Sequence, residues 1–231
     1  MTTISYIINV RNYFRGEEEL YTQTSSVDFM PSVLRTFALS LAIAFVGTMA
    51  GSFVPPALIL PLSILELVMI IAAVFFRRKK AISYSFLYVF TFISGITLYP
   101  IVGYYVATAG ANIVLMAFGS TTIVFSGIAV YAAKSKRNFS FLSGFLLAAL
   151  LALVAVGIFN LFVPLSSTGM LAYSFIGVLV FSGYVLFDIS RMKHYGVRAE
   201  DVPLMALSLY LDFINLFISI LRILGILNSK D

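Results

Sequence analysis

The sequence has no cysteine and only one histidine, His194. Without thiols, the chain can form no disulfide and offers no thiolate to a metal ion. A single imidazole does not complete the set of nitrogen and sulfur ligands that zinc prefers. We therefore expect neither a disulfide framework nor a zinc site, and we expect no bound cofactor.

Charge is scarce as well. Charged residues make up 11% of the 231 residues, whereas hydrophobic residues make up 61%. An average soluble domain carries about 25% charged and about 45–50% apolar residues. The mean hydropathy of +1.02 agrees with this shift. The composition excludes an ordinary soluble domain and indicates an integral membrane protein whose partner is the lipid bilayer.

Long apolar segments occupy most of the chain. A transmembrane helix needs about 20 apolar residues, and seven such segments are separated by charges, prolines or polar clusters. We expect spans at residues 33–54, 57–76, 81–103, 109–133, 139–162, 168–190 and 203–227. The sequence thus predicts an all-α polytopic membrane protein. A polar cytoplasmic segment over residues 1–30 precedes a seven-helix domain over residues 31–231.

Basic residues gather in alternate connections between the spans. Residues 77–80, 134–137 and 191–198 carry four, three and three of the 15 Lys and Arg, and the connections between them carry none. Positively charged loops stay in the cytoplasm. We therefore expect a cytoplasmic N-terminus and an external C-terminus in a plasma membrane. The net charge of +5 then comes from the basic connections that orient the chain in the membrane. We therefore expect no nucleic-acid partner.

Three acidic residues, Glu66, Asp188 and Asp212, lie inside the apolar segments, whereas the other seven acids do not. A carboxylate at membrane depth costs at least about 2.5 kcal/mol on insertion scales, so it marks a functional site by default. A rise of about 1.5 Å per residue places all three in the cytoplasmic half of the bundle or near its middle.

Polar residues on the last span are spaced by four, three, four and three positions, which places them on one helical face. They are Ser208, Asp212, Asn215, Ser219 and Arg222. Because polar groups cannot face lipid, we expect the seventh helix at the centre of the bundle. The two serines and Asn215 can be explained as residues that join helices through hydrogen bonds, each worth about 0.6 kcal/mol. Asp212 fits that role less well, because an asparagine would join helices without a desolvated charge.

The two aspartates can act as a pair if Asp188 meets Asp212. Such carboxyls share a proton at low pH and titrate together, which makes a proton sensor. Once ionised they repel each other and offer hard oxygen ligands to a passing Ca²⁺. A salt bridge from Arg77 to Asp188 would latch the cytoplasmic end, and its strength would change with the protonation of the pair. From position alone, a role for Arg77 in orienting the span is the simpler explanation.

Four short segments carry a resemblance to a known family. They are MALSLYLDFINLFI at 205–218, PLSILE at 61–66, FGST at 118–121 and GIFN at 157–160. The chain from about residue 30 to its end resembles the Bax inhibitor family, also called the transmembrane Bax inhibitor motif family, and is most similar to a bacterial member.

The resemblance implies a pH-sensitive Ca²⁺ leak channel in which six helices surround the seventh. It implies that Asp188 and Asp212 are the pH sensor and transient Ca²⁺ ligands, Arg77 the latch and Glu66 a pore residue. We take the ion pathway to include Glu66, Ser208, Asp212, Asn215 and Ser219, with Ca²⁺ and H⁺ as partners. Nothing in the sequence identifies a protein partner.

Two other functions would use the same aspartates. An intramembrane aspartyl protease could activate water with them, but such proteases carry Gly-x-Gly-Asp. Here Val-Leu-Phe precedes Asp188 and Tyr-Leu precedes Asp212, so we expect no enzyme. A proton-coupled cation carrier would use the pair as a proton relay and favours helices broken by Gly or Pro. Only Pro61 hints at one, and the carrier remains the alternative to a channel.

Overall fold

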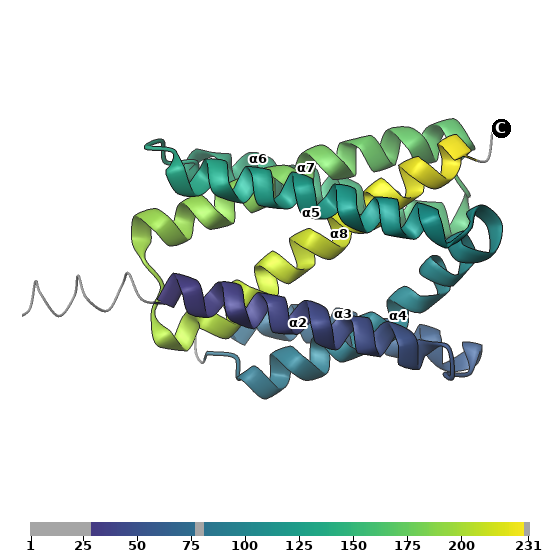
Figure 1. Cartoon of the computed structure of the whole chain (residues 1–231), viewed down its shortest axis with the longest axis horizontal. Helices are drawn as coiled ribbons and strands as arrows, with labels where there is room; N and C mark the ends of the chain where they lie inside the picture. The colour runs from purple at the N-terminus through teal and green to yellow at the C-terminus, as the bar shows by residue number, and fades with distance from the viewer. Residues whose placement is uncertain (1–28, 77–80, 229–231) are drawn as a thin grey trace, which may run out of the picture.

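The computed structural model describes residues 29–76 and 81–228. Its long helices are α2 (Phe29–Gly51), α3 (Pro56–Phe76), α4 (Tyr84–Ala109), α5 (Ala111–Lys134), α6 (Ser143–Phe162), α7 (Ser167–Tyr195) and α8 (Val202–Asn228). Short 3₁₀ turns, η1 (Ser140–Leu142) and η2 (Ala199–Asp201), precede α6 and α8. Seven helices are long and apolar enough to cross a membrane, and these described residues form no strand (Figure 1). The predicted seven-span all-α architecture is confirmed.

Helix α8 is the core of the bundle. Inside its most apolar window 61% of the residues are buried, against 6–39% in the other six helices. It crosses the bundle diagonally between α2 and α5 (Figure 1) and packs on α2, α4, α5 and α7. Leu209, Tyr210 and Leu216 on this helix have no exposed surface. The central position expected from its polar stripe is thus confirmed.

Two helices lie at the periphery. Helix α3 packs chiefly on α4, and α6 packs chiefly on α7. Only 6% of the apolar window of α3 and 11% of that of α6 are buried. Their apolar side chains therefore face outward, as expected of helices whose solvent is lipid.

Helices α2 and α4 approach most closely because both carry glycine at the contact. A Cβ atom at Gly95 would lie 2.1 Å from the carbonyl oxygen of Ala44, and one at Gly47 would lie 2.3 Å from that of Phe92. No side chain fits at such a distance, so small residues set this helix–helix spacing. The α2–α4 pair forms one wall against which α8 packs.

The structure corrects the predicted loop at Tyr104. Helix α4 continues through Tyr104 to Ala109, and Gly110 alone joins it to α5. Gly110 has a φ of 85°, which glycine adopts without steric cost. A single residue is therefore enough to reverse the chain at this point.

The structure also corrects the end of the sixth span, which was predicted at residue 190. Helix α7 continues to Tyr195, so His194 is helical and does not lie in a loop. Its Nδ1 atom lies 2.9 Å from the carbonyl oxygen of Ser190. Lys193 donates a hydrogen bond of 2.7 Å to the carbonyl oxygen of Ser135, the residue that caps α5. The cation thereby binds a helix C-terminus, where positive charge is favoured.

Candidate functional site: a buried carboxylate pair

The structure brings Asp188 of α7 and Asp212 of α8 together inside the bundle. Each aspartate is only 5% exposed, and their charges interact. Tyr184, one turn before Asp188 on α7, lies within electrostatic range of both carboxylates. Two acidic side chains from neighbouring helices therefore share one buried environment. This is the condition under which the two aspartates can act as a coupled pair.

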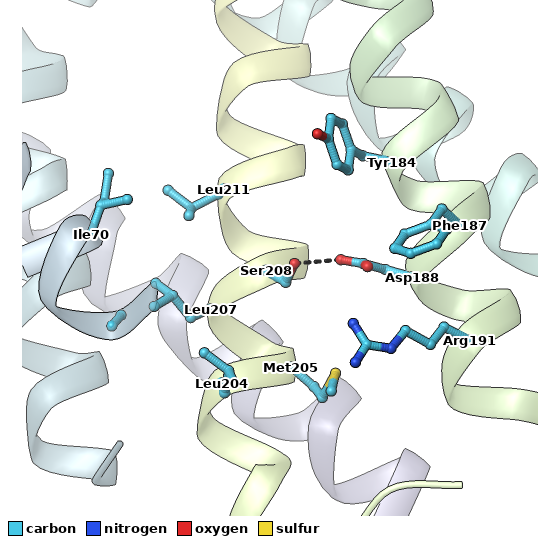
Figure 2. A pocket seen from close by; sticks show the side chains of 11 residues that line it. Ile70, Tyr184, Phe187, Asp188, Arg191, Leu204, Met205, Leu207, Ser208 and Leu211 are labelled. Carbon is cyan, nitrogen blue, oxygen red and sulfur yellow. Dashed lines mark hydrogen bonds between the residues drawn. The ribbon is translucent and has the colours of Figure 1, made fainter. Parts of the chain in front are cut away.

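The two carboxylates differ in how they are held. The hydroxyl of Ser208, one turn before Asp212 on α8, donates a hydrogen bond across the helix interface to Oδ2 of Asp188 (Figure 2). In contrast, Oδ2 of Asp212 is buried and makes no hydrogen bond within the described residues. Leaving a buried polar atom unsatisfied costs about 1–3 kcal/mol, and more for a charge. Asp212 is thus the member of the pair whose hydrogen bonding is less well satisfied.

A cavity of about 200 Å³ lies beside Asp188, at the end of the bundle where α7 ends and α8 begins. Its polar lining comes from Tyr184, Asp188, Arg191 and Ser208, and its apolar lining includes Ile70 and Ala73 of α3. Figure 2 shows Arg191 and Asp188 on the same side of α7, toward α8. Since one water occupies about 30 Å³ of liquid, the cavity has room for several waters next to the carboxylate.

Arg191 is a site residue that the sequence reasoning missed. We expected it to be only one of the basic residues that orient the chain, yet it lines the same cavity as Asp188. The available signal was its position three residues after Asp188, which places both on one helical face. The latch residue, Arg77, lies outside the described residues, so its contact with Asp188 remains a prediction.

Glu66 does not join the aspartate pair. Its Oε2 atom accepts a hydrogen bond of 2.7 Å from Thr97 of α4. The buried hydroxyl of Tyr210 lies within electrostatic range of Glu66 and faces Ser94, but the two hydroxyls do not reach hydrogen-bonding geometry. Tyr210 and Asp212 are two residues apart on α8, about 200° around the helix. The polar cluster of Glu66, Ser94, Thr97 and Tyr210 therefore lies on a different side of α8.

Asn215 and Ser219 bond to their own helix. The side-chain amide of Asn215 donates to the carbonyl oxygen of Leu211 at 2.8 Å. The hydroxyl of Ser219 donates to the carbonyl oxygen of Asn215 at 2.7 Å. The hydroxyl of Ser219 also packs against Gly177 of α7, where an added Cβ would lie 2.6 Å away. These contacts hold both side chains against their own helix without a ligand, which favours a structural role for them.

These features define a class: a seven-span helical membrane protein with a buried carboxylate pair between its last two helices. Comparison with known families is consistent with that class. The family model described as inhibitor of apoptosis-promoting Bax1 matches residues 27–229. The chain therefore belongs to the Bax inhibitor family.

Relatives of the chain come from bacteria, a fungus and a virus. An uncharacterised membrane protein of Vibrio cholerae is 38% identical over 232 residues, covering 92% of this chain and 98% of its own. Bax inhibitor 1 of Schizosaccharomyces pombe is 39% identical over 149 residues, which is 64% of this chain and 54% of the fungal protein. The Golgi anti-apoptotic protein of vaccinia virus is 31% identical over 211 residues, covering 91% and 81% of the two chains.

Proposed function

We propose that this protein is a pH-sensitive calcium leak channel of a bacterial plasma membrane, gated by the Asp188–Asp212 pair. The main observation in support is the placement of two interacting, buried carboxylates on neighbouring helices. The basic connections and the bacterial relatives support a cytoplasmic N-terminus in such a membrane. The resemblance to the family supplies the ion, Ca²⁺.

In this mechanism the charge of the pair decides how α7 and α8 sit together. Two unit charges about 4 Å apart interact by about 4 kcal/mol at an effective dielectric constant of about 20. An energy of that size is enough to move a two-state helix arrangement from mostly closed to mostly open. Ser208 already joins the two helices through Asp188, so a change at the carboxylates acts directly on the interface.

The pair also provides the transient binding site for the ion. Ca²⁺ takes six to eight oxygen ligands, and the residues here offer two carboxylates and the Ser208 hydroxyl. Waters in the cavity beside Asp188 would complete the shell. Such an incomplete protein shell suits an ion that passes through rather than one that stays.

The latch sets the sign of the pH response. The ionised pair carries two negative charges and would attract the guanidinium of Arg77, which closes the cytoplasmic end. As the pH falls, the pair gains a proton and loses one of these charges, so the attraction weakens. We therefore expect Ca²⁺ flux to rise with acidification. A rise with alkalinity would mean that repulsion within the pair governs the gate instead.

The test is Ca²⁺ flux into liposomes measured against pH. Asp188→Asn removes one carboxylate while keeping its size, and we expect it to abolish the pH dependence. Arg77→Ala should raise flux at a fixed pH, because the latch is lost. Ser40→Ala is the matched control, since this buried hydroxyl on α2 lies outside the proposed pathway and donates to the backbone of its own helix. A normal pH response in Asp188→Asn would exclude the pair as the sensor.

The carrier and the protease give different results in the same system. A leak channel passes Ca²⁺ down its gradient without obligatory proton movement, whereas a carrier exchanges protons for it. Proton uptake recorded beside Ca²⁺ flux separates the two. We propose no enzymatic activity, because neither aspartate has the protease glycines beside it. Cleavage of a reporter span that is lost in Asp212→Asn would reverse that conclusion.

A further inference from the structure

A second, apolar cavity lies among the described helices, away from the carboxylate pair. Its volume is about 460 Å³, and its walls come from α2, α4, α5 and α8. The only polar side chain in its lining is Thr48, whose hydroxyl already donates to the carbonyl oxygen of Ala44 at 2.9 Å. A cavity with no free hydrogen-bonding group does not hold ordered water. Any molecule that fills it must therefore be apolar.

The cavity opens sideways between α2 and α5. These helices are joined at one level by the stacked rings of Phe37 and Phe125, 5.1 Å apart, and Phe213 of α8 packs edge-on against both. Farther along α2 the wall residue Phe45 is 66% exposed, and on α5 the wall residue Leu115 is 68% exposed. The aromatic cluster thus closes one end of the gap, and the other end faces outward.

The opening lies at membrane depth within one leaflet. The lining residues of α2 run from Leu41 to Thr48, in the half of the helix that leads to Gly51. Those of α5 run from Val114 to Phe118, close to the start of that helix at Ala111. At about 1.5 Å per residue, Leu115 lies about 6 Å along α5 from that end. The molecules that face this opening are the hydrocarbon tails of lipids.

We propose that this cavity binds one acyl chain of a membrane phospholipid, drawn from the leaflet at the Gly51 and Ala111 ends of the helices. Its volume falls in the range of about 300–1,000 Å³ that is usual for ligand pockets. Lipid tails are as apolar as leucine, so the chain gains little from leaving the bilayer. Binding is favourable because the bound chain makes dispersion contacts with the cavity walls. An empty cavity would leave those wall atoms without such contacts.

The site has a consequence for α8. Phe213 and Phe217 line the cavity, and Phe213 directly follows Asp212 in the chain. Phe118 of α5 packs edge-on against both rings, at 5.8 and 6.4 Å. A bound chain therefore presses on the same stretch of α8 that carries the buried carboxylate. The binding itself does not depend on whether the protein conducts Ca²⁺.

Photolabelling of the full chain in liposomes tests the site. A phospholipid whose acyl chain carries a diazirine is mixed into the bilayer, and labelled peptides are mapped by mass spectrometry. We expect several-fold more label on the peptide with Leu115 and Phe118 than on the α6 peptide with Leu161 and Phe162. The α6 residues are 77% and 79% exposed and report ordinary contact with lipid. Equal labelling of the two peptides would overturn the proposal.

A cavity-filling variant makes the test specific. Ala42 is exposed and lines the cavity, so Ala42→Phe puts a ring where the chain would lie. We expect it to reduce the α5 label several-fold and leave the α6 label unchanged. Ala38→Phe is the control, because Ala38 is an exposed alanine one turn earlier on α2, outside the cavity. Equal effects of the two variants would contradict the site.

Two further arms cover the remaining outcomes. If Ala42→Phe does not fold, as judged by gel filtration in detergent, Leu115→Trp fills the cavity from the opposite wall and carries the same expectation. A photoreactive amino acid in place of Leu115 shows what lies in the opening. Crosslinks to phospholipid support the proposal. Crosslinks to a second copy of the chain, or to another segment of the same chain, would overturn it.

Discussion

Each side of α8 has a carboxylate near it, but the two sides hold that carboxylate in different ways. Toward α7, Asp212 lies with Asp188, and one of its oxygens makes no hydrogen bond within the described helices. Toward α3 and α4, Glu66 stands alone and accepts a hydrogen bond from Thr97. The first arrangement changes its energy when a single proton comes or goes, because two charges are coupled. The second is a single, partly satisfied group.

Burial follows the same division. Asp188 and Asp212 are each 5% exposed, in the interface between two well-packed helices. Glu66 is half-buried on α3, the helix with the least buried apolar window. A buried charge interacts strongly with its neighbours, whereas an accessible one is screened. If the proposed channel is correct, we expect sensing on the α7 side of α8 and ion passage without sensing on the α3 side, and mutations on each side test this expectation.

The largest effect is expected for Asp212→Asn. The variant keeps the shape of the side chain but removes the charge that couples to Asp188, so the pH dependence of Ca²⁺ flux should disappear. The amide still leaves a buried polar atom without a partner, but it removes the repulsion between the two carboxylates, so the folded state should gain stability at the pH values where both are ionised. Flux against pH and thermal unfolding in detergent measure the two outcomes. A variant that stays pH-dependent and becomes less stable would place the sensor elsewhere.

A smaller effect on the same side is expected for Ser208→Ala. The hydroxyl donates to Asp188 and favours its ionised form, and such a bond to a charged group is worth about 1.5–3 kcal/mol. Without it the pair holds its proton more readily, so the flux profile should move to higher pH by about 1–2 units. Ser208→Thr, which keeps the hydroxyl, should restore the wild-type profile. An unmoved profile in Ser208→Ala would show that the bond does not tune the pair.

The polar stripe of the last span was enough to predict that α8 is central and that Asp212 is buried. A period of three and four residues is a strong signal when the remainder of the helix is aliphatic and aromatic. The partner cluster at Glu66 was not predicted. Tyr210 stands among leucines and reads as an ordinary core residue. Thr91, Ser94 and Thr97 recur every three residues on their span, which is a signal that the prediction did not use.

Helix ends were the weaker part of the prediction. The segment 104–108 contains tyrosines and a threonine, which suggested a loop, but the helix continues because Gly110 alone can make the turn. Arg191 was assigned to a loop because positive charge marks the cytoplasmic side of a span. A basic residue can orient a span and also contribute to a site. At the end of a helix, its long side chain still reaches back to a carboxylate one turn away. Composition alone does not separate these two roles.

Glu66→Gln tests the other side of α8. The amide keeps a hydrogen-bond acceptor for Thr97 but removes the charge that would attract Ca²⁺. We expect flux to fall about fivefold at every pH, as for a loss of about 1 kcal/mol, with the pH midpoint unchanged. Thr97→Val, which removes only the hydroxyl donor, is the matched control for the hydrogen bond. A shift of the pH midpoint in Glu66→Gln would mean that the two sides of α8 are coupled.

The smallest effect is expected for Tyr210→Phe, because the hydroxyl that it removes is buried and makes no hydrogen bond to the described residues. Deleting an unsatisfied polar atom leaves the ring and its edge-on contact with Phe90, 6.2 Å between centroids, in place. The free energy of unfolding should therefore rise, by about 1 kcal/mol or less, and flux should keep its pH profile. Chemical unfolding in detergent measures the first and liposome flux the second. A clear loss of stability would mean that water or an ion bonds this hydroxyl in the membrane, and that the Glu66 side of α8 holds a ligand of its own.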